Sequence, residues 1–189
     1  MIEPIQWRAI ENVIHFWMSE STGLKTIWQN QDAPQPTWPY ATLNVIAGPL
    51  KVGQDGVRYE IDGDNLNACY NGMREFTVSC QVDGGPRGKC ETEAREFLTA
   101  AQFALGLPKY RDRFREVELS VVDDNGPVQS FDLVVGETWI TRSTLDIRFY
   151  TAANLIETGA DWFNEVEISS DMGTGNPSLE LDDELFGGP

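Results

Sequence analysis

Hydrophobic and polar residues alternate over residues 73–82, and this pattern predicts a half-buried antiparallel strand. Phe76, Val78, Cys80 and Val82 share one parity, while the residues between them are polar. Successive side chains of a strand point to opposite faces, so one face is buried here and the other meets solvent.

Two other segments predict core strands. Residues 40–47 are apolar and β-branched, and we expect Gly48 and Pro49 to stop this strand. Residues 138–150 carry the strongest pattern, in which Trp139, Leu145, Ile147 and Phe149 share one parity. Shorter strands are predicted at residues 24–28, 116–122, 129–135 and 162–168.

Helical spacing of apolar residues predicts two helices. The first covers residues 4–19, where Pro4 suits the first turn, and it ends before Gly23. The second covers residues 92–107, with stop signals at Gly106 and Pro108. The apolar stripes are Ile5, Ala9, Val13, Phe16 and Trp17 in the first helix, and Ala94, Phe97, Leu98, Ala101 and Leu105 in the second.

A proline-rich corner precedes the first core strand. Pro34, Pro36 and Pro39 restrict their own φ and push each preceding residue toward extended geometry, so residues 31–39 cannot be helical. Tyr40 then begins the strand, and we expect its ring to pack against the sheet or a helix.

Residues 50–72 are polar and rich in Gly, Asn and Asp, but they contain a short alternating pattern. Val57, Tyr59 and Ile61 recur at strand spacing. We interpret the segment as a long hairpin arm or loop, and these three residues as a candidate interface with another subunit.

The order of helices and strands has no regular βαβ alternation. It predicts an α+β fold with a mainly antiparallel sheet, two packed helices and a long hairpin arm. We expect one domain over residues 1–169, followed at residues 170–189 by a flexible acidic tail.

Charge and composition limit the functions available. The chain of 189 residues has 30 acidic and 14 basic residues, a net charge of −16, so its overall field repels phosphate-rich partners. No apolar run reaches the roughly 20 residues that cross a bilayer, and the N-terminus has no basic signal region. We therefore expect a soluble cytoplasmic protein without a membrane partner.

Few residues offer metal or catalytic chemistry. Three separated cysteines and a single histidine, His15, predict free thiols and no zinc site. Residues 84–90 sit between a strand and a helix as a phosphate-binding loop would. However, the spacing is one residue short, Pro86 removes a backbone donor, and Cys90 replaces the hydroxyl residue.

A calcium loop beginning at Asp62 also fails, because position six is Asn67 and position twelve is Met73. Pairs of carboxylates such as Asp123 and Asp124 are typical of turns. We expect no catalytic residues, no metal, no cofactor and no enzymatic activity.

Three segments together resemble the neck or tail terminator family of tailed bacteriophages. They are the proline corner running into Tyr40, the strand at residues 74–82 and the closing strand at residues 139–149. The resemblance covers residues 1 to about 150. It is carried by Pro34, Pro36, Pro39, Tyr40, Phe76, Arg142, Leu145, Asp146 and Phe149.

This resemblance implies a structural virion protein of the tail or neck, assembled in the host cytoplasm. Proteins of the family form rings, usually hexameric, that cap the tail tube and meet the head connector. The implied partners are further copies of the chain, the tail tube protein and the connector. DNA would pass through the ring without specific binding.

The sequence leaves alternatives open. An acidic inhibitor that mimics DNA fits the net charge, and a P-loop-like NTPase fits only the imperfect glycine loop.

Six tryptophans suit interface anchors. Arg142 and Asp146 share the less apolar face of their strand, where they are candidates for polar contacts within the sheet or between subunits. Residues after Arg148 contain no Lys or Arg, which is typical of a solvated tail, although the interspersed leucines also fit a docking peptide.

Overall fold

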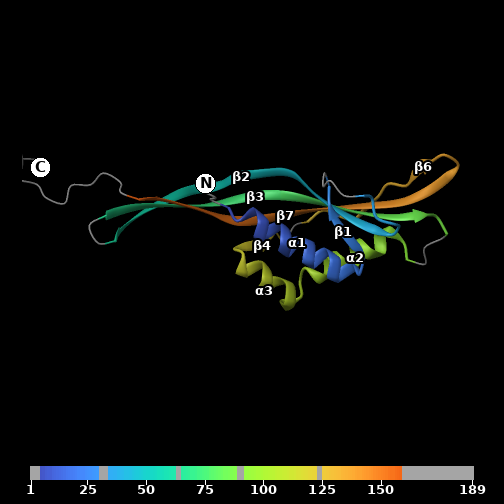
Figure 1. The fold of residues 1–189 in the computed structure, drawn as a ribbon, viewed down its shortest axis with the longest axis horizontal. Helices are drawn as coiled ribbons and strands as arrows, with labels where there is room; N and C mark the ends of the chain where they lie inside the picture. The colour runs from blue at the N-terminus through green and yellow to red at the C-terminus, as the bar shows by residue number, and fades with distance from the viewer. Residues whose placement is uncertain (1–4, 30–33, 63–64, 89–91, 123–124, 159–189) are drawn as a thin grey trace, which may run out of the picture.

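A computed structural model describes residues 5–29, 34–62, 65–88, 92–122 and 125–158 of the protein. Three long antiparallel strands form its central sheet (Figure 1). β2 (Tyr40–Asp62) pairs with β3 (Asn65–Pro86), and β3 pairs with β7 (Thr138–Thr158). Four short strands complete a seven-stranded sheet: β1 (Lys25–Trp28), β4 (Leu119–Val121), β5 (Gln129–Ser130) and β6 (Leu133–Val135). Within the described residues only β1 runs parallel to its neighbour, so the predicted α+β fold with a mainly antiparallel sheet is confirmed.

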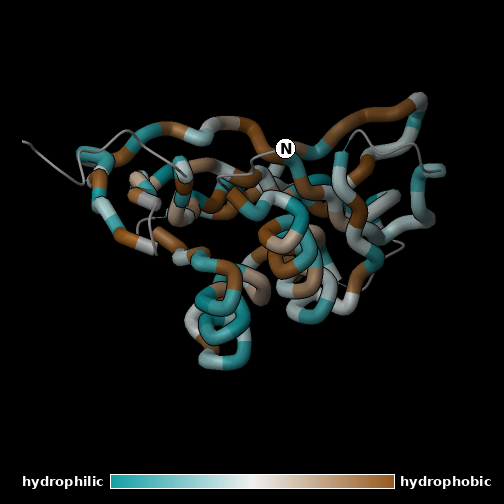
Figure 2. The backbone as a smooth tube through the Cα atoms, turned by 60° about the vertical axis from the view of Figure 1, so that its left-hand side comes forward, coloured by the Kyte–Doolittle hydropathy of each residue, from teal (hydrophilic) through white to brown (hydrophobic). Residues whose placement is uncertain are grey.

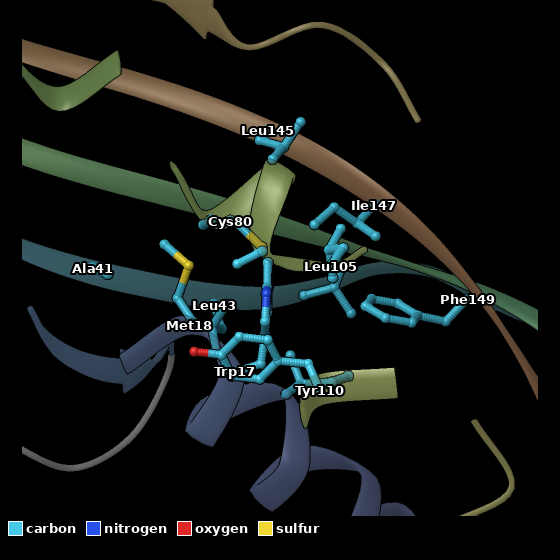
Figure 3. Close-up of a cluster of buried hydrophobic side chains, with 14 of the residues drawn as sticks. Trp17, Met18, Ala41, Leu43, Cys80, Leu105, Tyr110, Leu145, Ile147 and Phe149 are labelled. Atoms are coloured by element: carbon cyan, nitrogen blue, oxygen red, sulfur yellow. The ribbon is translucent and has the colours of Figure 1, made fainter. Parts of the chain in front are cut away.

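The helices α1 (Trp7–Thr22), α2 (Ala94–Ala104) and α3 (Pro108–Glu116) all lie on one face of the sheet (Figure 1). As the alternating pattern predicted, the apolar residues of β3 and β7 point to this face and lie beneath the helices. Side chains from the helices and the sheet meet in one buried cluster (Figure 3), which includes Trp17, Met18, Leu43, Cys80, Leu98, Leu105, Tyr110, Leu145, Ile147 and Phe149. Full burial of each large aliphatic side chain stabilises the fold by roughly 1.5–3 kcal/mol.

Of the stripe predicted for the first helix, Ile5 and Trp17 are buried, and the core also takes in Ile10 and Ile14 beside it. Ile10, Ile14 and Trp17 are fully or almost fully buried, whereas Val13 and Phe16 are half-buried and pack at the margin of the core. The helix ends at Gly23, whose φ of 69° is left-handed and whose N–H donates to the Ser19 carbonyl at 2.9 Å. Glycine adopts this conformation without a Cβ clash.

A third helix occupies residues that the sequence analysis left without a helix. Pro108 was interpreted as a stop signal for the preceding helix, but it occupies the first turn of α3. A proline fits there because the first N–H groups of a helix have no partner within it. Tyr110 and Phe114 lie four residues apart and are both buried against the core, which stabilises this short helix.

Gly48 and Pro49 do not stop β2, contrary to expectation. The strand continues to Asp62 through shifts of register at Ala47 and Leu50. A Cβ on Gly48 would lie 2.5 Å from the Glu75 carbonyl oxygen, and the φ of Gly48 is 95°. A glycine is therefore required where the irregular strand passes its neighbour, and the pairing resumes beyond it.

The hairpin arm is present, and it contains three strands. Residues 50–62 of β2 and 65–73 of β3 form the hairpin, and residues 152–158 of β7 extend beside it. The sequence predicted that the closing strand ends at Tyr150, but β7 runs to Thr158 because β3 offers a continuous pairing edge. We use "the arm" for these three segments, which project beyond the helices (Figure 1).

Several predicted features lie outside the described residues. They are Pro4, the turn at residues 123–124, Cys90 of the glycine loop, the strand at residues 162–168 and the tail at residues 170–189. Of the helices that the structure describes, none has the length and apolar character needed to cross a membrane.

Candidate functional site

A row of three polar side chains crosses the sheet where the proline corner meets it. Tyr40 of β2 is paired with Asp83 of β3, and Asp83 is paired with Arg142 of β7. Directly paired residues point to the same face, so all three lie on the face opposite the helices. The row joins the first family-motif segment to the last.

Asp83 is the centre of this row and is almost completely buried, with 2% of its side chain exposed. One carboxylate oxygen accepts a hydrogen bond from Arg142 Nε at 2.5 Å, and the other accepts one from Gln81 Nε2 at 2.9 Å. Both oxygens of the buried charge are therefore satisfied. This arrangement ties β3 to β7.

Tyr40 completes the row and is buried, as its predicted packing requires. Its hydroxyl accepts a hydrogen bond from Gln35 Nε2 at 2.8 Å, which connects the proline corner to the strand. Burial raises the pKa of the Tyr40 hydroxyl above its usual value, and the nearby Asp83 charge raises it further. The tyrosine thus stays neutral.

The proline corner itself lies at the surface. Pro34 is exposed, whereas Pro36 and Pro39 are half-buried. The ring of Trp38 covers Gly85, where an added Cβ would lie 2.9 Å from Trp38 Cβ. Gly85 therefore permits the corner to approach β3 closely.

The remaining motif residues divide between the two faces of the sheet. Phe76 and Phe149 stack with their ring centroids 5.5 Å apart in the core, and Leu145 is buried beside them. Asp146 is exposed on the same face as Arg142. The structure brings Arg142 into the polar row and leaves Asp146 without a contact that would give it a defined role among the described residues.

The arm carries the candidate interface on a face that the described part of the chain leaves exposed. Val57, Tyr59 and Ile61 are 46%, 63% and 63% exposed. Their paired neighbours on β3 are Tyr70, Ala68 and Leu66, and Leu155 of β7 is paired with Tyr70. These residues form one apolar face, which we call the arm face.

The arm face is a continuation of the core face of the sheet. Even-numbered residues of β3 from Leu66 to Val82 share one side because the β3–β7 register is continuous over them. Phe76 and Val78 lie beneath the helices, whereas Leu66 and Tyr70 lie beyond them. Apolar segments are accordingly visible both under the helices and away from them (Figure 2).

A second uncovered apolar surface lies at the other end of the sheet, and the sequence analysis did not identify it. Val134 of β6 is paired with Trp139 of β7, so both point to one side. They are 55% and 54% exposed. We call this pair the hairpin face; its signal in the sequence was the consecutive apolar residues Leu133–Val135 between turn residues.

The tryptophans, which the sequence suggested as interface anchors, differ in burial among the five that the structure describes; Trp162 lies outside the described residues. Trp17 is fully buried in the core, and its Nε1 has no hydrogen-bond partner within the described part of the chain. Trp7 and Trp28 are half-buried against the core. Trp38 and Trp139 are exposed, and they remain available to a partner.

The segments considered for chemistry have structural explanations. A cavity of about 320 Å³ adjoins the start of α2, but its arginines, Arg87 and Arg95, are balanced by Glu93 and Asp132. His15 Nε2 lies 2.9 Å from the Thr26 carbonyl and ties α1 to β1. Burial raises the pKa of the Cys80 thiol far above its usual value, so this thiol is unreactive. Among the described residues no three His, Cys, Asp or Glu side chains cluster as metal ligands would.

Comparisons with known proteins agree with the three motif segments. A family model described as phage neck terminator protein matches residues 8–174. The match includes all three motifs and runs beyond residue 150, where the resemblance seen in the sequence ended. No curated protein matches the chain. One solved structure is 15% identical with a TM-score of 0.42, over 76% of this chain and 91% of the other, a similarity too low to indicate function.

Proposed function

Because this chain belongs to the phage neck terminator protein family, we propose that it is a tail terminator, whose copies form a ring that caps the tail tube and joins it to the head connector. Family membership makes it a structural protein of the phage neck or tail, located in the virion. The finer role rests chiefly on the family match over residues 8–174.

The shape and surface of the chain support assembly with other copies. A cyclic ring closes when one patch binds a different patch on the next copy. The arm projects beyond the helices and carries apolar residues, Val57, Tyr59 and Ile61, that solvent reaches in the single chain. Contiguous exposed apolar surface of this kind marks an interaction site. The ring is proposed to be a hexamer, as the resemblance implies.

The net charge supports a channel through which DNA passes. The chain carries a net charge of −16, and a ring multiplies this negative field. Like charge repels the phosphate backbone, so DNA slides past without adhering. The tail tube protein and the connector are the proposed partners at the two ends of the ring. The virion is proposed to be assembled in the host cytoplasm.

The proposed function is tested by deleting the gene from the phage and examining the particles by electron microscopy. We expect filled heads separated from tails, and tails that lack a terminal ring. Supplying the wild-type protein from a plasmid should restore joined virions. Supplying a Phe103→Lys variant should restore them equally, since Phe103 is 80% exposed on α2, away from both the arm face and the hairpin face.

Normal, joined virions without the gene would contradict the proposed function. Competition with DNA for a host enzyme by the purified protein would favour the acidic mimic instead. The family match supports the structural role over the mimic, for which net charge is the main support.

A further inference from the structure

A groove lies beside α3, where this helix packs against β4 (Figure 1). It consists of two adjoining cavities, of about 190 Å³ and about 180 Å³, that share Arg111 and Val121 among their lining residues. Leu105, Phe114 and Leu119 also line these cavities and belong to the buried core. The floor of the groove is therefore apolar.

The rim of the groove is basic. Arg111 and Arg115 are exposed and lie one helical turn apart, so their side chains are neighbours. Among the described residues that line the two cavities there is no Asp or Glu. The cavity at the start of α2 differs, because its two arginines are balanced by Glu93 and Asp132.

The acids near the groove leave an excess of positive charge on α3. This helix has four basic and two acidic residues, in a chain whose net charge is −16. Arg115 donates to Asp112 at 2.8 Å, and Arg111 also has an interaction partner. Glu118, the next acid after the helix, accepts a hydrogen bond from Asn154 of β7. The Arg115–Asp112 pair has side chains 73% and 64% exposed, and exposed pairs of this kind exchange readily with another carboxylate because they stabilise little.

The other two cations of α3 lie toward α1. Lys109 is paired with Glu20, and the guanidinium of Arg113 lies 3.8 Å from the centre of the Phe16 ring. Neither cation lines the groove. Arg113 therefore provides a matched basic position on the same helix outside the groove.

The end of the chain has the complementary character. Residues 179–186, which lie outside the described residues, read LELDDELF and contain four acids and four large apolar residues. Residues 159–189 contain eight acids and no Lys or Arg. Carboxylates suit the arginines of the rim, and leucines suit the apolar floor.

The length of chain beyond β7 is sufficient to reach the groove. β7 ends at Thr158, and its Thr151 is paired with Leu119 at the floor of the groove. The strand from Thr151 to Thr158 is about 24 Å long. The 21 residues from Thr158 to Leu179 can span up to about 70 Å. A tethered segment has an effective concentration of roughly millimolar at a site within reach, which favours the groove of the same chain over that of another copy.

We propose that residues 179–186 dock in the groove beside α3 of their own chain, with apolar side chains on its floor and acidic side chains at Arg111 and Arg115. The docked segment competes with any acidic partner that approaches this surface. The contact is intramolecular, so it goes beyond the proposed ring and does not depend on it.

The docking is tested in the full chain by hydrogen–deuterium exchange with mass spectrometry. Backbone amides of residues 179–186 should exchange at least about 10-fold more slowly in the wild type than in Arg111→Glu, which places an acid between the two cavities. Arg113→Glu adds the same charge to the same helix outside the groove, and it should leave the protection unchanged. Arg111 is exposed, so folding should be unaffected, which circular dichroism checks.

A second measurement removes the other side of the contact. Leu181→Ser with Leu185→Ser keeps the acids of the segment and removes two of its apolar residues, so the groove should become free. A fluorescently labelled peptide of residues 177–189 should then bind this variant at least about 10-fold more tightly than the wild type, by fluorescence anisotropy. Adding Arg111→Glu to the same variant should abolish that binding.

Other outcomes would overturn the docking. Wild-type amides at residues 179–186 that exchange as fast as those of the free peptide would contradict it, and so would equal losses of protection in Arg111→Glu and Arg113→Glu. Protection that falls on dilution would mean that the segment docks on another copy instead. If Arg111→Glu were misfolded, Ser120→Glu, at an exposed residue that lines the same groove, would replace it.

Discussion

Asp83 is the residue that holds the polar row together through its buried carboxylate. It accepts hydrogen bonds from Arg142 and Gln81, and it lies opposite Tyr40. A buried charge of this kind is tolerated only while its partners remain, since a lone charge in the interior is strongly unfavourable. Substitutions in the row should therefore have larger effects than substitutions on the exposed part of the same face.

The first prediction compares Arg142 with Asp146, four residues apart on one face of β7. Arg142→Ala should lower the free energy of unfolding by about 3 kcal/mol, because it leaves the buried Asp83 carboxylate without its cation. Asp146→Ala should change it by less than about 0.5 kcal/mol, since Asp146 is exposed. Urea denaturation measures both values. Equal effects would mean that water reaches Asp83.

The second prediction separates the packing of Tyr40 from its hydrogen bond. Tyr40→Ala should cost about 3–5 kcal/mol in the free energy of unfolding, because the buried ring leaves a cavity. Tyr40→Phe should cost only about 1 kcal/mol, for the lost bond to Gln35. Thermal or denaturant unfolding gives the comparison. An unchanged melting temperature for Tyr40→Ala would place the ring in solvent.

Among the secondary-structure elements, the arm is stiffened by its own polar contacts. Arg74 donates to both carboxylate oxygens of Asp55, at 2.7 Å and 3.0 Å, and Lys51 Nζ lies 3.2 Å from the same carboxylate. Asp55 lies on β2 and Arg74 on β3, so this group clamps the base of the hairpin. A clamp there holds the arm face in a fixed direction relative to the body.

The third prediction concerns the pH dependence of this clamp. The hydrogen bonds from Arg74 lower the pKa of the Asp55 carboxyl from 3.8 to about 2. A carboxyl whose pKa is lower in the folded state stabilises that state fully above its unfolded pKa, and the contribution is lost as the pH falls toward 2.

NMR titration of the Asp55 carboxyl carbon measures this pKa directly. Arg74→Met should return the pKa toward its usual value and leave the core unchanged, because Arg74 lies outside the buried cluster. An Asp55 that titrates at its ordinary value in the wild type would show that the clamp is open in solution.

For the whole molecule, charge opposes assembly and apolar contact favours it. Every copy carries a net charge of −16, so copies in a ring repel one another. Salt screens this repulsion, with a Debye length of about 10 Å at 0.1 M, and it affects apolar contacts much less.

The fourth prediction follows from this balance. Raising the ionic strength from low to moderate values should strengthen self-association, measured as a lower dissociation constant by sedimentation. The Phe103→Asp variant should show the same trend, because it only adds one further negative charge. Association that weakens steadily with salt would mean that ion pairs such as those of Arg58, rather than the apolar faces, hold the copies together.

The sequence by itself determined the features that follow from local rules. The parity of Phe76, Val78, Cys80 and Val82 predicted their buried face, because side chains alternate in any extended strand. Helical spacing located α1 and α2, and three motif segments indicated the family. Even there the stripe predicted for α1 was only partly right: Trp17 is buried, but Ile10 and Ile14 are buried in place of Ala9 and Val13.

Only the tertiary structure decided how far the strands run and which polar groups are buried. β2 passes Gly48 and Pro49 because β3 supplies hydrogen bonds beyond them, and β7 extends to Thr158 for the same reason. α3 begins at a proline because Tyr110 and Phe114 reach the core. Asp83 is buried, and the arm and hairpin faces are left uncovered, through pairings between residues far apart in the chain. Such pairings depend on where the sheet and helices end in space, which no local pattern of residues encodes.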